Sequence, residues 1–337
     1  MPTSRPPTPP GSSIWAAMLV LYLVWGSTYL AVAIAVDTIP PFLMAGTRFL
    51  IAGFVLVGWS VARDRRAFEP PSRREWRDSS IVGALLVGAG MGLVAFGELT
   101  VPSGITALLI ATMPVWVAIL GRVLLGERLP RRAAVGIVIG FGGVAILVGP
   151  SAFGGAGALD PLGLAAIMLS PLAWAAGSMF ASHGAILPRR PLVSTGLQMI
   201  CGGLVLMVVA VLTGEFAAHH VAAISTGSVA ALLYLTMVGS LVAFSTYGWL
   251  LRVAPLPLVS TYAYVNPVVA VILGAIVLGE IVDARTIVAG AVILFAVALI
   301  VTARGRMRAP QGAAASERPG EAEPAVSTPA AAPAPTV

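Results

Sequence analysis

Ten long apolar runs constrain this chain more than any other feature of its sequence. Each run has about 17 to 25 residues, the length of α-helix that crosses the hydrocarbon core of a bilayer. Only 10% of the 337 residues are charged, whereas soluble domains carry about 25%. The pattern predicts an all-α integral membrane protein whose ten transmembrane helices cover 14–36, 41–62, 80–97, 104–125, 133–149, 161–182, 192–213, 227–250, 256–278 and 285–302.

The two ends of the chain differ in composition from the apolar runs. Residues 1–13 are rich in Pro, Ser and Thr, and residues 304–337 are rich in Ala, Pro, Glu and Ser, so we expect two disordered tails. The first apolar run exceeds the core of about 7 to 15 residues in a signal peptide, so we interpret it as an uncleaved helix. The longest loop, near 63–79, is too short for a catalytic domain. We therefore expect the function to lie within the membrane.

Arginines in the loops predict the orientation of the helices. With the amino terminus in the cytoplasm, the outer loops hold only Arg285, and the inner loops with the segment at the end of the last helix hold fifteen arginines. Positive residues concentrate on the cytoplasmic side of membrane proteins, so we expect both termini in the cytoplasm. The inner set is Arg63, Arg65, Arg66, Arg73, Arg74, Arg77, Arg128, Arg131, Arg132, Arg189, Arg190, Arg252, Arg304, Arg306 and Arg308.

Residue types that are missing or rare exclude several kinds of chemistry. All 20 basic residues are arginine, which excludes a P-loop lysine for nucleotide phosphates and a lysine Schiff base. Cys201 is the single cysteine, so no disulfide forms within the chain. His219 and His220 have only Glu215 nearby, too few ligands for a metal. We expect no cofactor, no metal and no nucleic-acid partner, and we attribute the net charge of +6 to membrane topology.

The two halves of the chain share short motifs in the same order. Pro114 and a Leu-Gly-Glu motif at 125–127 correspond to Pro267 and a Leu-Gly-Glu motif at 278–280, at a constant shift of 153 residues. Because each half has an odd number of helices, the second half enters the membrane in the opposite sense. The sequence thus predicts two inverted five-helix repeats, at 14–150 and 161–303. Secondary transporters are commonly built this way, with the substrate near the midplane between the repeats.

Several short motifs, in order along the chain, resemble those of one transporter family. They are Trp-Gly-Ser-Thr-Tyr at 25–29, Pro-Pro at 40–41, Ala-Gly-Thr-Arg-Phe at 45–49, Glu98 followed by Val-Pro-Ser-Gly at 101–104, and Tyr-Ala-Tyr-Val-Asn-Pro at 262–267. The first three resemble the drug/metabolite transporter (DMT) superfamily, EamA family, and the last two resemble its YedA-like exporters. The resemblance covers about residues 14–303. It implies a ten-helix carrier of the inner membrane that moves small metabolites or drugs, usually outward.

The leading functional hypothesis is a secondary transporter that exports its substrate by alternating access around a midplane site. Without a nucleotide motif, it would use an ion gradient or the gradient of the substrate itself. An intramembrane enzyme and a channel are the alternatives. The few ionisable residues in the apolar runs form no nucleophile–base pair, acid pair or metal set, and no ring of filter residues stands out. We therefore predict that the protein is not an enzyme.

Polar and aromatic side chains within the apolar runs are the candidate substrate ligands. Tyr262 and Asn266 share one face of the ninth predicted helix, and polar groups in a membrane helix face the bundle interior rather than lipid. They bind either the substrate or another helix. Tryptophans either stack on an aromatic or cationic substrate or serve as packing residues. The full candidate set is Trp25, Thr28, Arg48, Trp116, Trp174, Tyr262, Tyr264 and Asn266.

Arg48 and Glu98 are the ionisable residues of greatest interest. Arg48 falls about seven residues, roughly 10 Å, into the second predicted helix, where an unpaired charge is costly. It neutralises a substrate carboxylate, pairs with Glu98, or binds loose backbone carbonyls. Glu98, at the outer end of the third helix, is the candidate for proton coupling, because burial raises the pKa of an acid towards neutrality. The alternative is an acid at the water boundary.

The charge inventory also indicates the class of substrate. One arginine, one acid and several aromatic residues suit an amino acid-like zwitterion or an amphipathic drug-like amine. A highly phosphorylated substrate would need several cations within the helices, and the apolar runs do not contain them.

Two prolines and a pair of glycines predict local features. Pro114 and Pro267 each remove the backbone hydrogen bond to the carbonyl four residues earlier, so both helices are expected to kink, either around a central cavity or for packing alone. Gly136 and Gly140 have the spacing that allows close helix contact, either within the chain or in a homodimer. Membrane lipids and a small-molecule substrate are the other expected partners.

Overall fold

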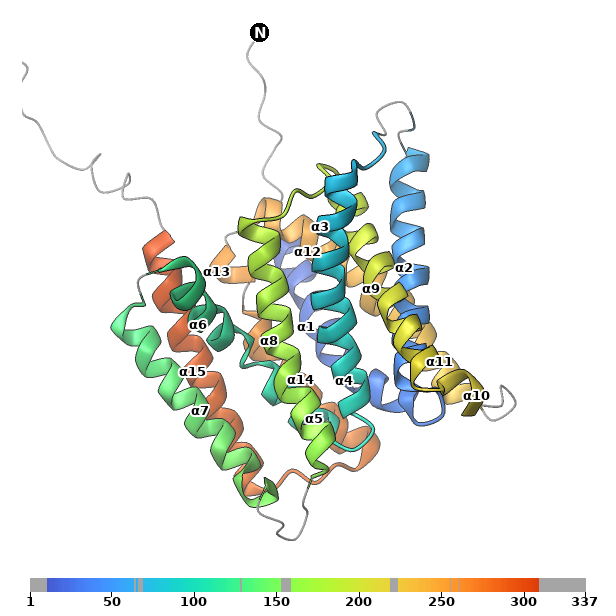
Figure 1. Cartoon of the computed structure of the whole chain (residues 1–337). Coiled ribbons are helices and arrows are strands. Elements are labelled where there is room, and N and C mark those ends of the chain that lie inside the picture. Colours follow the sequence, from blue (N-terminus) through green and yellow to red (C-terminus); the bar gives the residue numbers. More distant parts are fainter. Residues whose placement is uncertain are drawn as a thin grey trace, which may run out of the picture.

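The computed structural model describes residues 11–63, 65, 69–127, 129–152, 159–218, 224–254, 256–259 and 261–308. These residues form a bundle of helices and contain no strand (Figure 1). Nine helices in this part of the chain are long and apolar enough to cross a membrane, and α14 (Tyr262–Leu278) is a shorter apolar helix. The predicted all-α membrane fold is confirmed. Most of both expected tails, and Arg66, Arg128, His219 and His220, lie outside the described residues.

The first half of the chain supplies five spans. They are α1 (Gly11–Val36), α2 (Pro41–Arg63), a third span made of α3 (Arg73–Gly83), the π-helical segment η1 (Ala84–Met91) and α4 (Gly92–Gly97), a fourth made of α5 (Ser103–Ile110) and α6 (Met113–Leu125), and α7 (Arg131–Ala152).

The second half supplies the equivalent elements. They are α8 (Pro161–His183), α9 (Pro191–Leu212) with the short α10 (Glu215–Ala218), a span made of α11 (Thr226–Tyr234), the π-helical segment η3 (Leu235–Val242) and α12 (Ala243–Val253), the short α13 (Leu256–Val259) followed by α14, and α15 (Ala284–Arg308). The helix α15 thus extends to Arg308, into the segment expected to be a tail.

The third span begins earlier than its apolar run. Ser72 caps α3 with its side chain, and Glu75 returns the hydrogen bond, which forms a capping box. Arg73, Arg74 and Arg77 therefore lie in the first turns of a helix and not in a loop. The apolar run, which starts near residue 80, could not indicate these two polar turns.

The expected kink at Pro114 is instead a break in the helix. Helix α5 ends at Ile110, a turn follows at residues 111–112, and Pro114 lies in the first turn of α6. A proline is tolerated there because the first N–H groups of a helix have no partner within it. Pro267, in contrast, lies inside α14, and the chain breaks several residues earlier, between α13 and α14. The two prolines are therefore equivalent in sequence but not in local structure.

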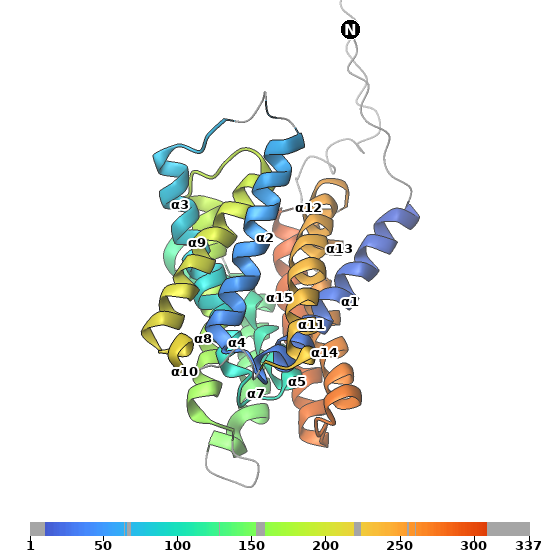
Figure 2. The ribbon, with the colours of Figure 1, turned by 90° about the vertical axis from the view of Figure 1, so that its right-hand side faces the viewer.

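The halves pack as antiparallel equivalents, which supports the inverted repeat. Helices α2 and α9 lie side by side (Figure 2), and so do α7 and α15. A Cβ on Gly46 would lie 3.3 Å from the carbonyl oxygen of Gly203, and a Cβ on Gly53 would lie 2.7 Å from that of Gly196. Gly46 and Gly196 occupy equivalent positions in the two halves, and so do Gly53 and Gly203, because each pair is 150 residues apart. Exchanging the halves therefore converts the contact between Gly46 and Gly203 into the contact between Gly53 and Gly196.

The glycine pair on α7 is used within the chain. A Cβ on Gly136 would lie 2.8 Å from Ile300 Cγ1, and a Cβ on Gly140 would lie 3.5 Å from Ala296 Cβ, both on α15. The close approach of α7 to α15 occupies this face, so a homodimer would need another surface.

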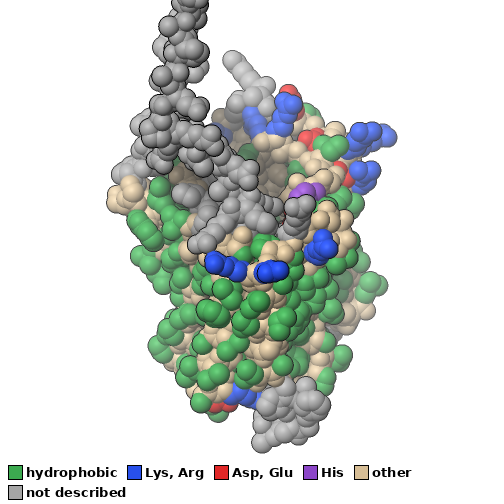
Figure 3. All heavy atoms as spheres, turned by 90° about the vertical axis from the view of Figure 1, so that its left-hand side faces the viewer, with side chains coloured by type: hydrophobic (Ala, Val, Ile, Leu, Met, Phe, Trp, Pro, Cys, Tyr) green, Lys and Arg blue, Asp and Glu red, His purple; other side chains and the backbone are tan. Residues whose placement is uncertain are grey.

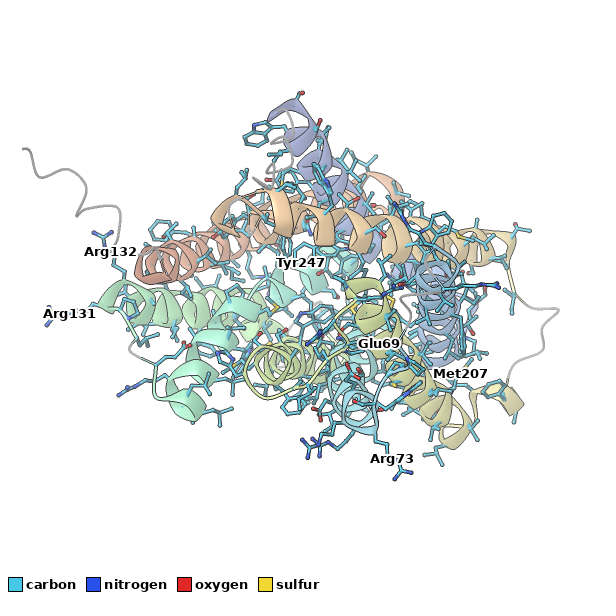
Figure 4. The ribbon with its side chains drawn as sticks, turned by 90° about the horizontal axis from the view of Figure 1, so that it is seen from above. Glu69, Arg73, Arg131, Arg132, Met207 and Tyr247 are labelled. Carbon is cyan, nitrogen blue, oxygen red and sulfur yellow. The ribbon has the colours of Figure 1, made fainter. Side chains whose placement is uncertain are left out.

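Charged side chains differ between the two ends of the bundle. We call the end where α1 begins and α15 ends the arginine end; it carries Arg63, Arg73, Arg74, Arg131, Arg132 and Arg189. Figure 4, which looks onto this end, shows Arg73, Arg131 and Arg132 at the rim, pointing outward. The other end, which we call the opposite end, carries Asp37, Glu98, Asp160, Glu215, Glu280, Asp283 and Arg285. On the face in Figure 3, hydrophobic side chains cover most of the surface between these ends.

Candidate functional site

Four aromatic rings from three spans meet in the bundle, and we call them the aromatic cluster: Trp25, Phe244, Tyr247 and Tyr262. The ring centroid of Trp25 lies 5.4 Å from Phe244, 5.2 Å from Tyr247 and 5.0 Å from Tyr262. Tyr247 and Tyr262 lie 5.9 Å apart. Figure 4 shows Tyr247 near the middle of the bundle. Edge-to-face contacts of this kind are favourable, and they join α1, α12 and α14.

Hydrogen bonds next to this cluster tie α14 to α1. The hydroxyl groups of Tyr22 and Thr261 are in hydrogen-bond contact. Asn266, 7% exposed, donates its side-chain amide to the carbonyl oxygens of Tyr22 and Tyr262 at 3.3 and 3.2 Å in the orientation that satisfies both. The side-chain amide of Asn266 is therefore used within the protein, where it ties α14 to α1.

Arg48 is buried where α2 meets the π-helical segment η3. Its side chain is 3% exposed, its Nε donates to the hydroxyl of Ser240 at 3.0 Å, and its Cζ lies 4.7 Å from the ring centroid of Phe49. A Cβ on Gly239 would lie 3.3 Å from Nη2 of Arg48. The guanidinium head therefore reaches the surface of η3 that faces α1.

Thr28 connects this arginine to the aromatic cluster. The methyl group of Thr28 lies against Gly239, since a Cβ atom added to Gly239 would lie 3.1 Å from this methyl carbon. Its hydroxyl donates to the carbonyl of Trp25 at 2.6 Å, one turn earlier on α1. Arg48, Thr28, Trp25 and Tyr262 therefore form a continuous strip, which is the candidate site.

The other predicted ligands lie elsewhere in the bundle. Trp116 packs edge-to-face on Phe141 of α7, with ring centroids 5.8 Å apart. Trp174 covers η1, because a Cβ on Gly90 would lie 3.1 Å from its Cε3. Tyr264 packs in the hydrophobic cluster beside α5, and its buried hydroxyl has no hydrogen-bond partner among the described residues. The structure does not bring these three residues to the strip at Arg48.

Glu98 is separate from Arg48. It lies one residue beyond the span Arg73–Gly97, it is 7% exposed, and neither of its carboxylate oxygens has a hydrogen-bond partner among the described residues. The suggested ion pair with Arg48 is therefore not formed: no described residue bonds to the Glu98 carboxylate, and the Arg48 guanidinium bonds to Ser240. Burial raises the pKa of the Glu98 carboxyl group well above its ordinary value, and the nearby carboxylate of Glu280 raises it further.

A shallow cavity of about 380 Å³ opens at the opposite end. It is lined by residues 36–41 between α1 and α2, together with Leu99, Thr213 and Glu215. None of the candidate substrate ligands lines this cavity, so the cavity and the strip at Arg48 are separate.

Several residues of the strip were not predicted from the sequence. Ser240 and Gly239 hold the arginine, and Phe244 and Tyr247 complete the aromatic cluster. One signal was available: residues 244 and 247 are three apart, so their rings share a helix face. The contact of Ser240 with Arg48 left no trace in the sequence, because the two residues are 192 positions apart.

Two antiparallel halves of apolar helices, with a buried cation and an aromatic cluster between spans, define a membrane carrier. The EamA-like transporter family matches residues 12–149 and 161–302, once in each half. The chain belongs to this family, and it is a multi-pass membrane transporter built of two repeats.

Individual relatives agree with the family. The chain is 35% identical to the "Uncharacterized inner membrane transporter YedA" of Escherichia coli (strain K12), over 77% of this chain and 81% of the relative. It is 26% identical to the "Probable amino-acid metabolite efflux pump" of the same strain, over 71% and 80%. A solved crystal structure at 20% identity shares the fold with a TM-score of 0.58, covering 88% of this chain and 99% of the other.

Proposed function

We propose that this transporter exports an amino acid-like or amphipathic drug-like compound from the cytoplasm by alternating access. Arg48 binds the carboxylate of the substrate, Thr28 lies beside it, and the aromatic cluster accommodates the apolar or cationic part. A relative named as a probable amino-acid metabolite efflux pump supports this substrate class. In this proposal the strip at Arg48 binds the substrate, and Glu98, which lies apart from the strip, is the candidate for proton coupling.

One observation carries the proposal. Among the arginines whose side chains the structure describes, Arg48 is the buried one. The single guanidinium of Arg48 matches one carboxylate through paired N–H donors, and Thr28 beside it lies one turn of α1 from Trp25. Aromatic faces next to it suit a ring or an amine through stacking and cation–π attraction.

The arginine end supports the proposed topology. The start of α1 and the end of α15 lie at this end (Figure 1), together with most of the described arginines. By the positive-inside rule this end faces the cytoplasm, so both termini are cytoplasmic. In the proposed cycle the substrate enters from the arginine end and leaves at the opposite end, driven by an ion gradient or by its own gradient.

A thermal-shift screen tests the substrate class. Detergent-purified protein is heated with amino acids, aromatic cations, nucleosides or sugar phosphates, because a ligand of the folded state raises its stability by mass action. We expect carboxylate-bearing amphipathic compounds to raise the melting temperature. Sugar phosphates that bind while amino acids do not would overturn the substrate class.

Arg48→Gln and Arg48→Lys then test the site. The glutamine variant removes the charge, and the lysine variant keeps the charge but loses the planar pair of donors. We expect both to lose most of the ligand-induced shift. Arg122→Gln is the matched control, since Arg122 is an exposed arginine near the end of α6. A ligand shift that survives in Arg48→Gln would move the substrate away from this strip.

A further inference from the structure

The carboxylate of Glu280 joins the two repeats at the opposite end of the bundle. Glu280 follows α14 in the second repeat and binds the start of α5 in the first. Its Oε1 accepts hydrogen bonds from the backbone N–H and the hydroxyl of Ser103, both at 2.7 Å, and its Oε2 accepts one from the backbone N–H of Gly104 at 2.9 Å. Anions stabilise helix N-termini, and charge-assisted bonds are strong. We call these three hydrogen bonds the Glu280 latch.

Two glycines give the latch its geometry. Gly279 adopts a left-handed conformation with φ of 67°, which ends α14 and lets the Glu280 N–H bond to the carbonyl of Gly274 at 3.1 Å. A Cβ on Gly274 would lie 2.5 Å from Oε2 of Glu280 and 2.9 Å from Oγ of Ser103. The Leu-Gly-Glu motif and Gly274 together bring the carboxylate onto α5.

The latch holds the part of the fourth span that is separated from α6 by a break in the helix. Helix α5 packs mainly against α14, with smaller contacts to α1, α8 and α15, whereas α6 packs mainly against α8. The turn at residues 111–112 separates α5 from α6. Helix α1 also packs closely on α14, since a Cβ on Gly26 would lie 2.6 Å from Cβ of Val269. Release of Glu280 would therefore free one end of the bundle without unfolding a continuous helix.

Glu98 is buried next to this latch. Both of its carboxylate oxygens are without a hydrogen-bond partner among the described residues, and Glu280 is close enough to repel it. The titratable groups on the elements around it are Tyr29 of α1, Glu280, and Asp160 before α8, and Asp37 and Glu215 line the cavity beside Leu99. Helix α2 presents the apolar Phe42, which stacks on Phe96. Arg285, the described arginine at this end, lies 3.5 Å from Asp283.

We propose that Glu98 is a proton-binding site whose occupancy controls the Glu280 latch. In the latched state a bound proton removes the second negative charge from a buried site where no described residue donates a hydrogen bond to Glu98. Loss of the proton leaves two neighbouring carboxylates, and opening the latch exposes both to water. Protons therefore favour the closed opposite end, and their release favours the open one. This deepens the proposed transport cycle, because it links a proton to the opening of one side.

The reactivity of an engineered cysteine tests the latch without substrate. In a Cys201→Ala background, Thr106→Cys places a thiol on α5 at a position that is 0% exposed in the latched state. Purified protein in detergent is labelled with a maleimide at pH 6 and pH 8. Ile281→Cys, at a loop residue that is 90% exposed, corrects for ionisation of the thiol. After this correction we expect labelling at least about fivefold faster at pH 8 than at pH 6.

Three carboxylate variants separate the proton site from the latch. Glu98→Gln keeps the site neutral and should give slow labelling at both pH values. Glu280→Gln weakens the latch and should give fast labelling at both. Glu215→Gln is the matched control, because its carboxylate accepts from the N–H groups of Phe42 and Leu43 at 3.3 and 2.8 Å, at the start of α2. It should keep the pH dependence of the parent. Melting curves establish that each variant is folded.

The outcomes are distinguishable from those of the substrate tests. Labelling that is independent of pH in the parent, or a pH dependence that persists in Glu98→Gln, would overturn the proton site. Protection in Glu280→Gln equal to that of the parent would overturn the latch. No substrate is present in this assay, so either failure leaves the role proposed for Arg48 unaffected, and the reverse also holds.

Discussion

Arg48 and Glu98 are both buried, but their surroundings satisfy them in different ways. A guanidinium stays charged at any physiological pH, and Arg48 has the Ser240 hydroxyl and the Phe49 ring beside it. A carboxyl group can become neutral by binding a proton, and Glu98 has no hydrogen-bond partner among the described residues. At the scale of single residues, the proposals therefore assign carboxylate binding to Arg48, whose charge is fixed, and proton binding to Glu98, whose charge can change.

Gly239→Ala should disturb the strip at Arg48. The added Cβ would lie 3.1 Å from the methyl carbon of Thr28 and 3.3 Å from Nη2 of Arg48, so these side chains must shift. Overpacking of this kind typically costs about 1–3 kcal/mol, and we expect a loss near the lower limit together with weaker ligand binding. Scanning fluorimetry with and without ligand measures both effects. Gly142→Ala has nothing within 4 Å of its Cβ and should be neutral or stabilising. Equal losses in the two variants would contradict this explanation.

At the scale of the elements, the two π-helical segments are the least predictable feature. η1 and η3 have eight residues each, and they occupy equivalent positions in the third and eighth spans. π-helical turns are rare and frequently lie at functional sites. Both segments are apolar on nearly every side, so their sequence pattern does not differ from that of an α-helix. The ten spans were predictable because length and hydropathy suffice for them. The turn before Pro114 was not predictable. A proline lacks a backbone N–H and so weakens a helix, but this does not determine at which residue the helix breaks.

Ser170→Ala tests how η1 is supported. The hydroxyl of Ser170, 2% exposed on α8, donates to the carbonyl oxygen of Gly90 in η1 at 2.7 Å. Hydrogen bonds between membrane helices contribute about 0.6 kcal/mol on average and at most about 1.7, so we expect a destabilisation in this range. Ser182→Ala, whose exposed hydroxyl bonds to Ser178 in its own helix, should change stability less. Unfolding of both variants in denaturing detergent gives the comparison, and a larger loss in Ser182→Ala would refute it.

At the scale of the whole molecule, sequence and structure agree on the repeat. The constant shift between halves predicts it, and the paired glycine contacts of α2 and α9 reproduce it in space. The composition of the candidate site was predicted in part: Trp25, Thr28, Arg48 and Tyr262 come together, whereas Trp116, Trp174 and Tyr264 do not. Which candidates meet depends on how spans from different halves pack, as in the contact of Arg48 with Ser240. No periodicity along one helix contains that information.

The proposed topology predicts the behaviour of reporter fusions. Green fluorescent protein attached after Val337 should fluoresce in a bacterial host, and alkaline phosphatase at the same place should be inactive, since the arginine end remains in the cytoplasm. Phosphatase inserted after Ile281, between α14 and α15, should be active. Active phosphatase at the carboxyl terminus would reverse the orientation and, with it, the proposed direction of export.

The carboxylates that cap helices across the repeats also bear on how the two halves diverged. Glu215 and Glu280 both belong to the second half, and both complete helix starts of the first, at α2 and α5. Pro41 and Pro191, which begin α2 and α9, are 150 residues apart. At the same spacing, the residue of the first half that corresponds to Glu215 is Arg65. A pair of identical first halves would therefore bring a cation to the positive end of α2, where it is repelled. If the gene were divided between the halves, its products should assemble as a heterodimer and not as two homodimers.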